Sequence, residues 1–363
     1  CAAPFIFKSI SSSSSSNHYC MIGERLLTLE NRVLCWGENE DGQLGINDYE
    51  EKLIPTEIMS IDNAVSVFTG GYHTCALLND ATVKCWGSNE DGQLGDGSDT
   101  SSNLPVTVSG ISGVTKVSLG ADHSCAVIGN PGEVKCWGYN ELGQLGDGTN
   151  TASSLPVSLN PAILDAVDIF SGDNHTCAIL DTGSVKCWGQ GSNGELGNGT
   201  LEDSNTPVDV QNVTLASSGV GGSSFSCIND DEDTYCWGLN FNGALGTGNH
   251  DDNYQATSPE EVDVETGSLT VYASGKYRNC SLTDGYMSCW GEFVEADDNN
   301  NPLERREPLE INSEYEFLAI GSTKEGNCAI STKNSIHCFG NGYLGDGEES
   351  RFNSEPTFTS YIY

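Results

Sequence analysis

Apolar and polar residues alternate in short runs that recur about every fifty residues along the chain. In one such unit, apolar and β-branched residues at 71–78 and 83–87 flank a polar turn at Asn79 and Asp80. Two runs of this kind around a short polar turn are typical of a β-hairpin. The unit returns seven times with variations, so the sequence predicts seven structural repeats.

Each unit also contains two further strand-like runs. A run that ends in glycine comes before the hairpin, at 65–70, 114–120 and 167–172, and residues 5–10 can supply this run for the first unit. A glycine-rich loop follows the hairpin, for example at 91–97 and 142–148. A proline is then predicted to open a fourth strand, at 55–58, 105–108, 156–159 and 207–210.

Four short strands in about fifty residues make one blade of a β-propeller. The sequence therefore predicts an all-β, seven-bladed propeller over residues 5–363, with residues 1–4 as an N-terminal remnant or linker. Propellers grow by repetition, so 363 residues need no second core. Since 356–362 can form the last strand, the ring is expected to close with little strand sharing. The predicted repeats are roughly 5–63, 64–113, 114–165, 166–214, 215–267, 268–314 and 315–363.

Fourteen of the fifteen cysteines fall in pairs, one pair in each hairpin. Cys75 and Cys85 lie equally far from their turn, so they can face each other across an antiparallel pair at a distance that a disulfide spans. Metal binding by thiolates is the alternative, but no C-x-x-C spacing is present. Seven disulfides indicate an oxidising compartment. The predicted pairs are Cys20 with Cys35, Cys75 with Cys85, Cys125 with Cys136, Cys177 with Cys187, Cys227 with Cys236, Cys280 with Cys289 and Cys328 with Cys338.

The leftover Cys1 stands in a segment that is not a complete signal peptide. Three interpretations stay open: a trimmed N-terminus, a domain cut from a longer chain, or a mature lipoprotein acylated on Cys1 and followed by the serine run 11–16.

The formal net charge of −37 restricts the classes of molecule that the protein can bind. It argues against nucleic acid, which needs a basic face, and against anionic membrane surfaces. No apolar run is long enough to insert into a bilayer. The charge suits a secreted protein in a cation-rich medium, and solubility alone is an equal explanation.

Two rows of residues accompany the cysteines. Histidine stands two positions before the first cysteine in four units, and Phe225, Arg278 and Gly326 take this place in the others. Equivalent positions on separate blades lie too far apart for one metal ion, so these histidines are predicted to tie strand to loop by hydrogen bonds. Tryptophan follows the second cysteine in six units and is predicted to pack between blades; stacking on a sugar would require exposure. The histidines are His18, His73, His123 and His175, and the tryptophans are Trp36, Trp86, Trp137, Trp188, Trp237 and Trp290.

The loop at 87–92 resembles a calcium loop, but glycine stands at the first ligand position and Ser98 where the closing glutamate belongs. A tight turn is therefore predicted, no cofactor is expected, and weak surface calcium drawn by charge density is the alternative.

The sixth unit lacks the glycine-rich loop after Trp290. A repeat that departs from its own pattern can carry a grafted function, and drift in an unconstrained loop is the other explanation. The residues of this candidate partner-binding loop are Asp297, Asp298, Asn299, Asn300, Arg305 and Arg306.

Four N-glycosylation sequons begin at Asn174, Asn198, Asn212 and Asn279. Asn198 and Asn212 lie in loop-like segments and are the better candidates, whereas Asn279 is next to a predicted disulfide. The sequons support a eukaryotic secretory origin.

The recurring pattern Gly-x-x-His-Thr-Cys-Ala-Leu, then Val-Lys-Cys-Trp-Gly-x-Asn-x-x-Gly-Gln-Leu-Gly, resembles the repeats of the regulator of chromosome condensation family. The resemblance covers nearly the whole chain, is fullest in the second and third units and weakest in the sixth, and implies a seven-bladed propeller. The founding member is a nuclear nucleotide-exchange factor, a role that an acidic, cysteine-paired chain does not inherit. The cysteine pairs resemble those of secreted members, such as crinkly-type receptor kinase ectodomains, and one secreted member inhibits a β-lactamase.

The sequence contains no Gly-x-Ser-x-Gly elbow, phosphate-binding loop or His-Glu-x-x-His motif. We therefore expect a non-enzymatic extracellular or cell-surface scaffold that binds proteins, either copies of itself or other matrix and surface proteins, as a domain of a larger assembly or filament. A carbohydrate-binding module and a secreted enzyme inhibitor are the alternatives. A glycoside hydrolase that uses two of the many carboxylates ranks below both.

Overall fold

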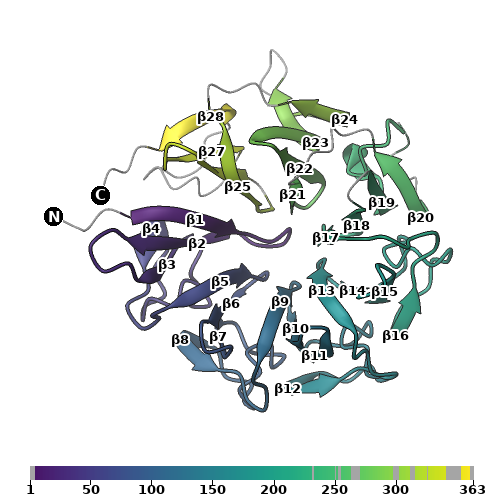
Figure 1. The fold of residues 1–363 in the computed structure, drawn as a ribbon, viewed down its shortest axis with the longest axis horizontal. Helices are drawn as coiled ribbons and strands as arrows, with labels where there is room; N and C mark the ends of the chain where they lie inside the picture. The colour runs from purple at the N-terminus through teal and green to yellow at the C-terminus, as the bar shows by residue number, and fades with distance from the viewer. Residues whose placement is uncertain are drawn as a thin grey trace.

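The chain forms a ring of seven blades around a central axis (Figure 1). The structure is a computed structural model. It describes residues 5–230, 233–249, 251, 255–262, 270–296, 302–310, 315–324, 326–340 and 353–359. Each blade has four antiparallel strands that follow one another along the chain, and the single pair Gly132–Ala166 joins blades three and four into one eight-stranded sheet. The predicted all-β, seven-bladed propeller is confirmed.

The first strand of each blade lies nearest the axis (Figure 1). These inner strands are β1 (Phe5–Ser11), β5 (Ala64–Thr69), β9 (Val114–Leu119), β13 (Ala166–Ser171), β17 (Ser218–Gly221), β21 (Thr270–Ser274) and β25 (Phe317–Ser322). The second strands are β2 (His18–Arg25), β6 (His73–Leu78), β10 (His123–Gly129), β14 (His175–Leu180), β18 (Phe225–Asn229), β22 (Arg278–Thr283) and β26 (Gly326–Ser331).

The third and fourth strands form the outer half of each blade. The third strands are β3 (Asn31–Gly37), β7 (Val83–Gly87), β11 (Gly132–Gly138), β15 (Val185–Gly189), β19 (Thr234–Leu239), β23 (Tyr286–Ala296) and β27 (Ile336–Gly340). The fourth strands are β4 (Lys52–Glu57), β8 (Ser102–Thr107), β12 (Ser153–Ser158), β16 (Ser204–Asp209), β20 (Gln255–Val262), β24 (Pro302–Glu310) and β28 (Asn353–Thr359). One 3₁₀ turn, η1 (Phe241–Gly243), lies in the loop of blade five.

The fourth strands begin earlier than the prolines predict. In blade two, β8 starts at Ser102, which pairs with Gly87, and Pro105 lies inside the strand. The register shifts between the pair Gly87–Ser102 and the pair Cys85–Val106. Pro105 therefore lies in a bulge of the outer edge strand. A missing N–H costs no ladder bond at such a place, which is why proline is tolerated mid-strand.

One disulfide joins the second and third strands of every blade, as predicted. The paired cysteines lie directly opposite each other, with S–S distances of 2.02–2.12 Å and Cα–Cα distances of 4.1–4.2 Å. A cross-link inside each sheet stabilises a unit that could not bury a core alone.

The ring closes by packing, because blades one and seven each take all four described strands from one repeat. Asn334 of blade seven accepts from Phe7 N (2.7 Å) and donates to Phe5 O (2.8 Å). Apolar side chains of both blades form one core cluster across this seam. The expected lack of strand sharing between the chain ends is therefore seen in the described strands.

Tryptophan locks each glycine-rich loop onto the next blade. The indole of Trp86 is fully buried and donates to the carbonyl oxygen of Gln43, in the loop of the preceding blade, at 2.9 Å. Trp137, Trp188, Trp237 and Trp290 make the same bond to the preceding loop at 2.7–3.0 Å. Glycine is required where the loop meets the ring: a Cβ on Gly95 would lie 2.7 Å from the indole nitrogen of Trp137.

Each of the four histidines forms a hydrogen bond to a strand residue of the next blade. The predicted hydrogen-bonding role is therefore right, but the predicted partner, a loop, is wrong. His73 Nε2 lies 2.9 Å from Ser124 Oγ on the next blade, and that hydroxyl donates to Gln93 O at 2.9 Å. Because the Ser124 hydroxyl donates its proton to Gln93 O, it can only accept from His73, so His73 Nε2 carries the proton and donates it to Ser124 Oγ. His18, His123 and His175 reach Thr74, Thr176 and Ser226 in the same way, at 2.7–2.8 Å.

Blades six and seven depart from the pattern together. Blade six extends β23 and β24 in place of the glycine-rich loop, with Glu292 opposite Glu304 and Ala296 opposite Pro302. Blade seven has Phe339 where the others have tryptophan. Phenylalanine has no N–H to donate, and the loop that would accept is missing from blade six, so the two departures are matched.

The described residues contain no helix with the length and apolar character that a bilayer crossing requires.

The buried histidines predict a specific pH dependence. Burial lowers the pKa of His73 to about 3, so between this value and the unfolded value of about 6.5 only the unfolded chain binds the proton. Stability is therefore full above pH 6.5 and falls as the pH drops toward 3. His73→Gln keeps a donor and removes the titration, so its stability deficit at pH 7.5 should shrink by about 2 kcal/mol at pH 5.

Urea unfolding at pH 7.5 and pH 5 measures the difference in unfolding free energy between wild type and the variant. His73→Phe, which copies Phe225 of blade five, should show the same narrowing with a larger deficit at pH 7.5. A gap that is equal at the two pH values would contradict this account of the histidines.

Candidate functional site

A ring of loops surrounds the axis at the end where the first and third strands finish. We call this end the hub surface and define it by the residue before each second strand in blades one to six: Asn17, Tyr72, Asp122, Asn174, Ser224 and Tyr277. The carbonyl oxygen of each accepts a hydrogen bond from the residue that follows the Trp-Gly pair of its own blade, at 2.8–3.1 Å. The main chain is therefore the same in six blades, while the side chains differ.

Main-chain bonds also link the ring from blade to blade. Gly71 N donates to Ala121 O at 3.0 Å, and Ala121 N donates to Asp173 O at 2.9 Å. A fixed frame that presents different side chains at equivalent positions is the arrangement expected of a recognition surface.

Blades one to four make half of the hub surface acidic. Asp122 is the most strongly perturbed carboxyl there: burial first, then the charges of Asp91, Asp173 and Asp41, raise its pKa to about 6. Burial and neighbouring carboxylates also raise the pKa of Asp41, Asp91 and Glu38. These groups repel one another because little positive charge lies among them.

Tyr72 stands among these carboxylates with 45% of its surface exposed. Its pKa is raised by burial first and then by Glu38, Asp122 and Asp41. An exposed aromatic ring surrounded by charge is the kind of residue that anchors protein contacts.

Blades five to seven of the hub surface carry aromatic and basic groups, and the charge of Lys324 in blade seven acts on Glu38 of the adjoining blade one. The Tyr277 ring meets the exposed Phe241 edge-on, with centroids 4.8 Å apart, and Lys276 Nζ lies 4.8 Å from the centroid of Tyr277. Lys324 of blade seven is exposed, and its carbonyl oxygen accepts from Arg278 at 2.6 Å. The hub surface is thus polarised, with carboxylates on blades one to four and lysines on blades six and seven.

The loop between β1 and β2, which contains the serine run, reaches toward the centre of the ring (Figure 1). In blade one, six residues join the first and second strands where blade two has three, so the loop reaches farther. Ser14 Oγ donates to Asp173 of blade four, which also accepts from Ser223 of blade five at 2.6 Å. Beneath it is a cavity of about 320 Å³ lined by the inner strands and by the hydroxyls of Ser11–Ser14.

The candidate partner-binding loop is placed only in part. Asp297, Asp298, Asn299 and Asn300 lie outside the described residues. Arg305 and Arg306 belong to β24, where Arg305 pairs with Gly291 of β23. This position is at the hub end of blade six, since β23 runs toward that end and β24 away from it.

The four sequon asparagines differ in access. Asn212 is exposed, and Asn198 is half-buried; its Oδ1 accepts from both the N–H and the hydroxyl of Thr200, at 3.0 and 2.9 Å. Asn174 is half-buried in the hub surface and accepts from Gln144. Asn279 is fully buried and donates to Cys227 Sγ at 3.1 Å, so folded protein gives an enzyme no access to it.

In the loop that resembles a calcium site, the asparagine side chain forms hydrogen bonds to the main chain of the same loop. Asn89 is buried, its Oδ1 accepts from Leu94 N at 2.9 Å, and its Nδ2 donates to the carbonyl oxygens of Ser98 and Thr100. Those groups brace a turn, as the sequence predicts. Within the described ranges, no three histidine, cysteine or carboxylate side chains gather as a metal site would require.

Sequence reasoning missed the role of two insertions in blade one. The serine run entered only the lipoprotein interpretation of Cys1, although the longer interval before His18 marks it as an enlarged loop. The hairpin between Cys20 and Cys35 spans fifteen positions where the others span nine to eleven, which marks a second insertion. Both signals are irregularities in an otherwise constant spacing.

Comparison with known proteins gives a consistent match. The profile of the RCC1-like domain family matches residues 32–360. The ultraviolet-B receptor UVR8 of Arabidopsis thaliana is 28% identical over 187 residues, which are 50% of this chain and 31% of UVR8. The chain thus spans less than a third of that relative.

Solved structures agree on the fold. Yeast RCC1 (Prp20), solved with Kap60, superposes with a TM-score of 0.79 at 18% identity over 98% of this chain and 86% of that chain. The CRINKLY WD40 ectodomain of the Arabidopsis thaliana receptor kinase ACR4 gives 0.52 at 18% identity, over 97% and 99%.

Asp122 provides a test of the hub electrostatics. Its pKa is raised above the unfolded value of 3.8, so the folded protein holds the proton more tightly and loses stability as the pH rises from about 4 to about 6. Asp122→Asn removes the charge and should stabilise the protein at pH 7.5 by about 1 to 2 kcal/mol, with no gain at pH 4.

Denaturant unfolding at the two pH values measures this difference. Asp99→Asn, on an exposed residue of the same acidic sequence, is the matched control and should change stability by less than about 0.5 kcal/mol. Destabilisation by Asp122→Asn at pH 7.5 would show that the carboxylate is needed and not merely tolerated.

Proposed function

The chain belongs to the RCC1-like domain family, and from this membership and its geometry we propose that it is a non-enzymatic, extracellular or cell-surface scaffold that binds proteins through the hub surface. The RCC1-like propeller fold supports a protein-binding scaffold.

One observation carries the choice of surface: the hub main chain is constant from blade to blade while its side chains are sorted by charge. A scaffold that only needed solubility would have no reason to gather lysines and aromatic rings on one side and perturbed carboxylates on the other. Complementary charges steer a partner and fix its orientation, so a partner with one basic and one acidic flank fits best.

The extracellular setting rests on the disulfides and on the likeness to a receptor-kinase ectodomain. Seven disulfides in one chain persist in an oxidising compartment and are rare in the cytosol. The ACR4 ectodomain shares the fold. Asn212, which is exposed, and Asn198, which is half-buried in a surface loop, are proposed to carry N-linked glycans in such a compartment.

The sixth-blade hairpin is proposed to add to the same contact. β23 continues five residues past Gly291 at the hub end, and the chain between the two strands carries Asp297, Asp298, Asn299 and Asn300. Arg305 and Arg306 follow in β24. We infer that this hairpin replaces a structural loop with a partner contact beside the lysine side of the hub surface.

Removing the Tyr72 ring and the Asp122 charge from the acidic half of the hub surface should abolish partner binding without unfolding the protein. The test immobilises wild-type protein and the double variant Tyr72→Ala, Asp122→Asn, and exposes both to the extracellular fraction of the source. A protein retained by wild type should be lost from the double variant. Tyr286→Ala is the matched control, because Tyr286 is 61% exposed at the opposite end of blade six, and it should retain the partner.

Equal retention by all three proteins would move the interface away from the hub surface. Catalytic turnover of a retained component would contradict the non-enzymatic proposal.

Peptide mapping of protein from its source tests the secretory proposal. Asn198 and Asn212 should carry hexose-containing glycans, and Asn279 should be unmodified because its amide is buried against a disulfide sulfur. Bare asparagines at both Asn198 and Asn212, together with free thiols, would contradict an N-glycosylating secretory route.

A further inference from the structure

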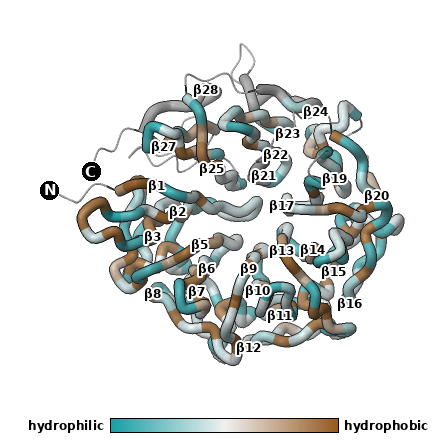
Figure 2. The backbone as a smooth tube through the Cα atoms, in the orientation of Figure 1, coloured by the Kyte–Doolittle hydropathy of each residue, from teal (hydrophilic) through white to brown (hydrophobic). Residues whose placement is uncertain are grey.

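The hairpin between β2 and β3 presents apolar side chains to solvent at the end of blade one opposite the hub surface. Its tip exposes Leu27 by 81%, Leu29 by 70% and Leu26 by 45%. Figure 2 shows this turn as an apolar segment on the outside of the ring. Elsewhere among the residues whose exposure the structure describes, exposed leucines stand singly, so three within four residues require an explanation.

The tip is held rigidly. Leu29 N donates to Arg25 O at 2.8 Å, and Arg25 N donates to Glu30 O at 3.0 Å. Leu29 has a φ of +57°, a conformation that costs a residue with a side chain about 1 kcal/mol and persists only where its surroundings fix it. A rigid tip loses little conformational freedom when it binds.

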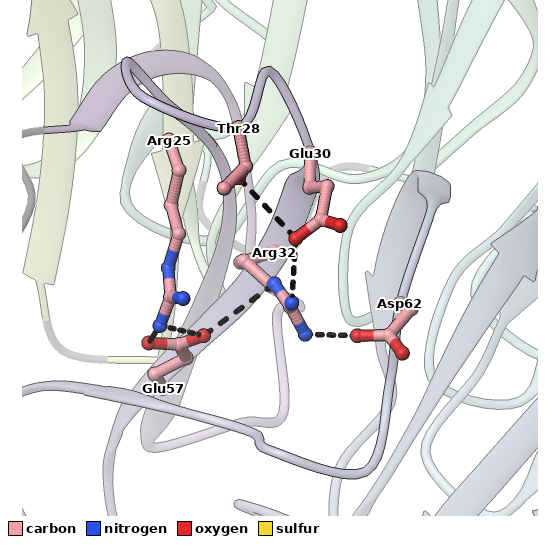
Figure 3. Close-up of polar contacts among 6 residues, drawn as sticks. All are labelled: Arg25, Thr28, Glu30, Arg32, Glu57 and Asp62. Carbon is pink, nitrogen blue, oxygen red and sulfur yellow. Dashed lines mark hydrogen bonds and ion pairs between the residues drawn. The ribbon is translucent and has the colours of Figure 1, made fainter.

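Two arginines brace the tip from beneath (Figure 3). Arg25 Nη2 donates to both carboxylate oxygens of Glu57, at 2.8 and 2.6 Å. Arg32 reaches Glu57 at 3.6 Å and Glu30 at 2.8 Å, and it also contacts Asp62. Thr28 donates to Glu30 at 3.2 Å, which fixes the turn from above.

This bracing also neutralises the region. Of the nine ion pairs in the part of the chain that the structure describes, six join residues between positions 8 and 62, and all of these except Lys52–Asp48 lie around the tip. Around the tip, three cations (Lys8, Arg25 and Arg32) face four carboxylates (Glu24, Glu30, Glu57 and Asp62), a net charge of −1 on a chain of −37. Charge compensation is thus concentrated where the leucines are exposed.

The charge distribution selects the partner. Two copies of this chain repel each other over most of their surfaces, because each carries −37. They can approach where carboxylates are paired and apolar groups are exposed, which is the tip of blade one. Met59 (72% exposed) and Ile6 (40%) widen the apolar surface there, since β4 ends and β1 begins at the same end of the blade.

We propose that the leucine tip, defined by Leu26, Leu27 and Leu29, is a self-association site that binds the same tip of a second copy about a two-fold axis. A two-fold contact needs a patch that complements itself, and paired charges around an apolar centre satisfy that condition. The small area makes the dimer weak and dependent on concentration. This deepens the proposed scaffold function by naming one partner, a copy of the chain.

Sedimentation equilibrium of the disulfide-intact protein from micromolar to about 1 mM tests the proposal. Wild type should form dimers whose affinity increases as salt rises from about 20 to 500 mM, because screening reduces repulsion between acidic copies. Leu27→Asp should weaken dimerisation about tenfold or more. Leu215→Asp, at a leucine 68% exposed on the same end of another blade, should leave it unchanged.

Leu27→Ser is a milder second variant, and unchanged melting curves show that each variant is folded. A monomer at every concentration and salt would overturn the proposal, as would a dimer that Leu215→Asp weakens as much as Leu27→Asp. Hub-surface binding to another protein should weaken with salt, so failure of self-association and failure of the scaffold proposal give different results.

Discussion

In most blades one indole N–H donates to a main-chain carbonyl oxygen in the loop of the preceding blade, at 2.7–3.0 Å. Both groups are buried, and each would cost about 1–3 kcal/mol if left without a partner. A histidine bond to the next blade runs beside four of these contacts. The ring therefore depends on polar bonds between blades as much as on apolar packing, and the disulfides act inside each blade.

Because other residues hold the blades together, the side chains of the hub surface are less constrained. The glycine, histidine and tryptophan positions are fixed by close contacts; a Cβ on Gly120, for example, would lie 2.1 Å from His123. The residue just before each second strand joins the frame through its carbonyl oxygen in six blades. The side chains of Asp122 and Asn174 each add one long hydrogen bond, from Gln93 and Gln144 at 3.4 Å. The side chain at this position can change without disturbing the ring, which is why tyrosine, aspartate, asparagine and serine all occur there and why the proposed binding surface lies there.

Much of the architecture follows from the sequence because it depends on spacing within one unit. Cys75 and Cys85 face each other since both are equally far from their turn, and Trp86 turns away from them because neighbours in a strand alternate sides. The partners of these residues in other blades could not be predicted. That His73 meets Ser124, that Trp86 bonds Gln43, and that Ser14 reaches Asp173 depend on which distant units become neighbours. The start of β8 at Ser102 was missed because a bulge shifts its register.

Cross-linking mass spectrometry on native material from the source tests most directly whether the hub surface is where the protein meets its partner. Lys276 and Lys324 lie on that surface, whereas Lys84, Lys135 and Lys186 lie on third strands in the outer half of their blades. The account predicts cross-links from Lys276 and Lys324 to a different protein. Cross-links to other proteins that come only from Lys84, Lys135 or Lys186 would contradict it.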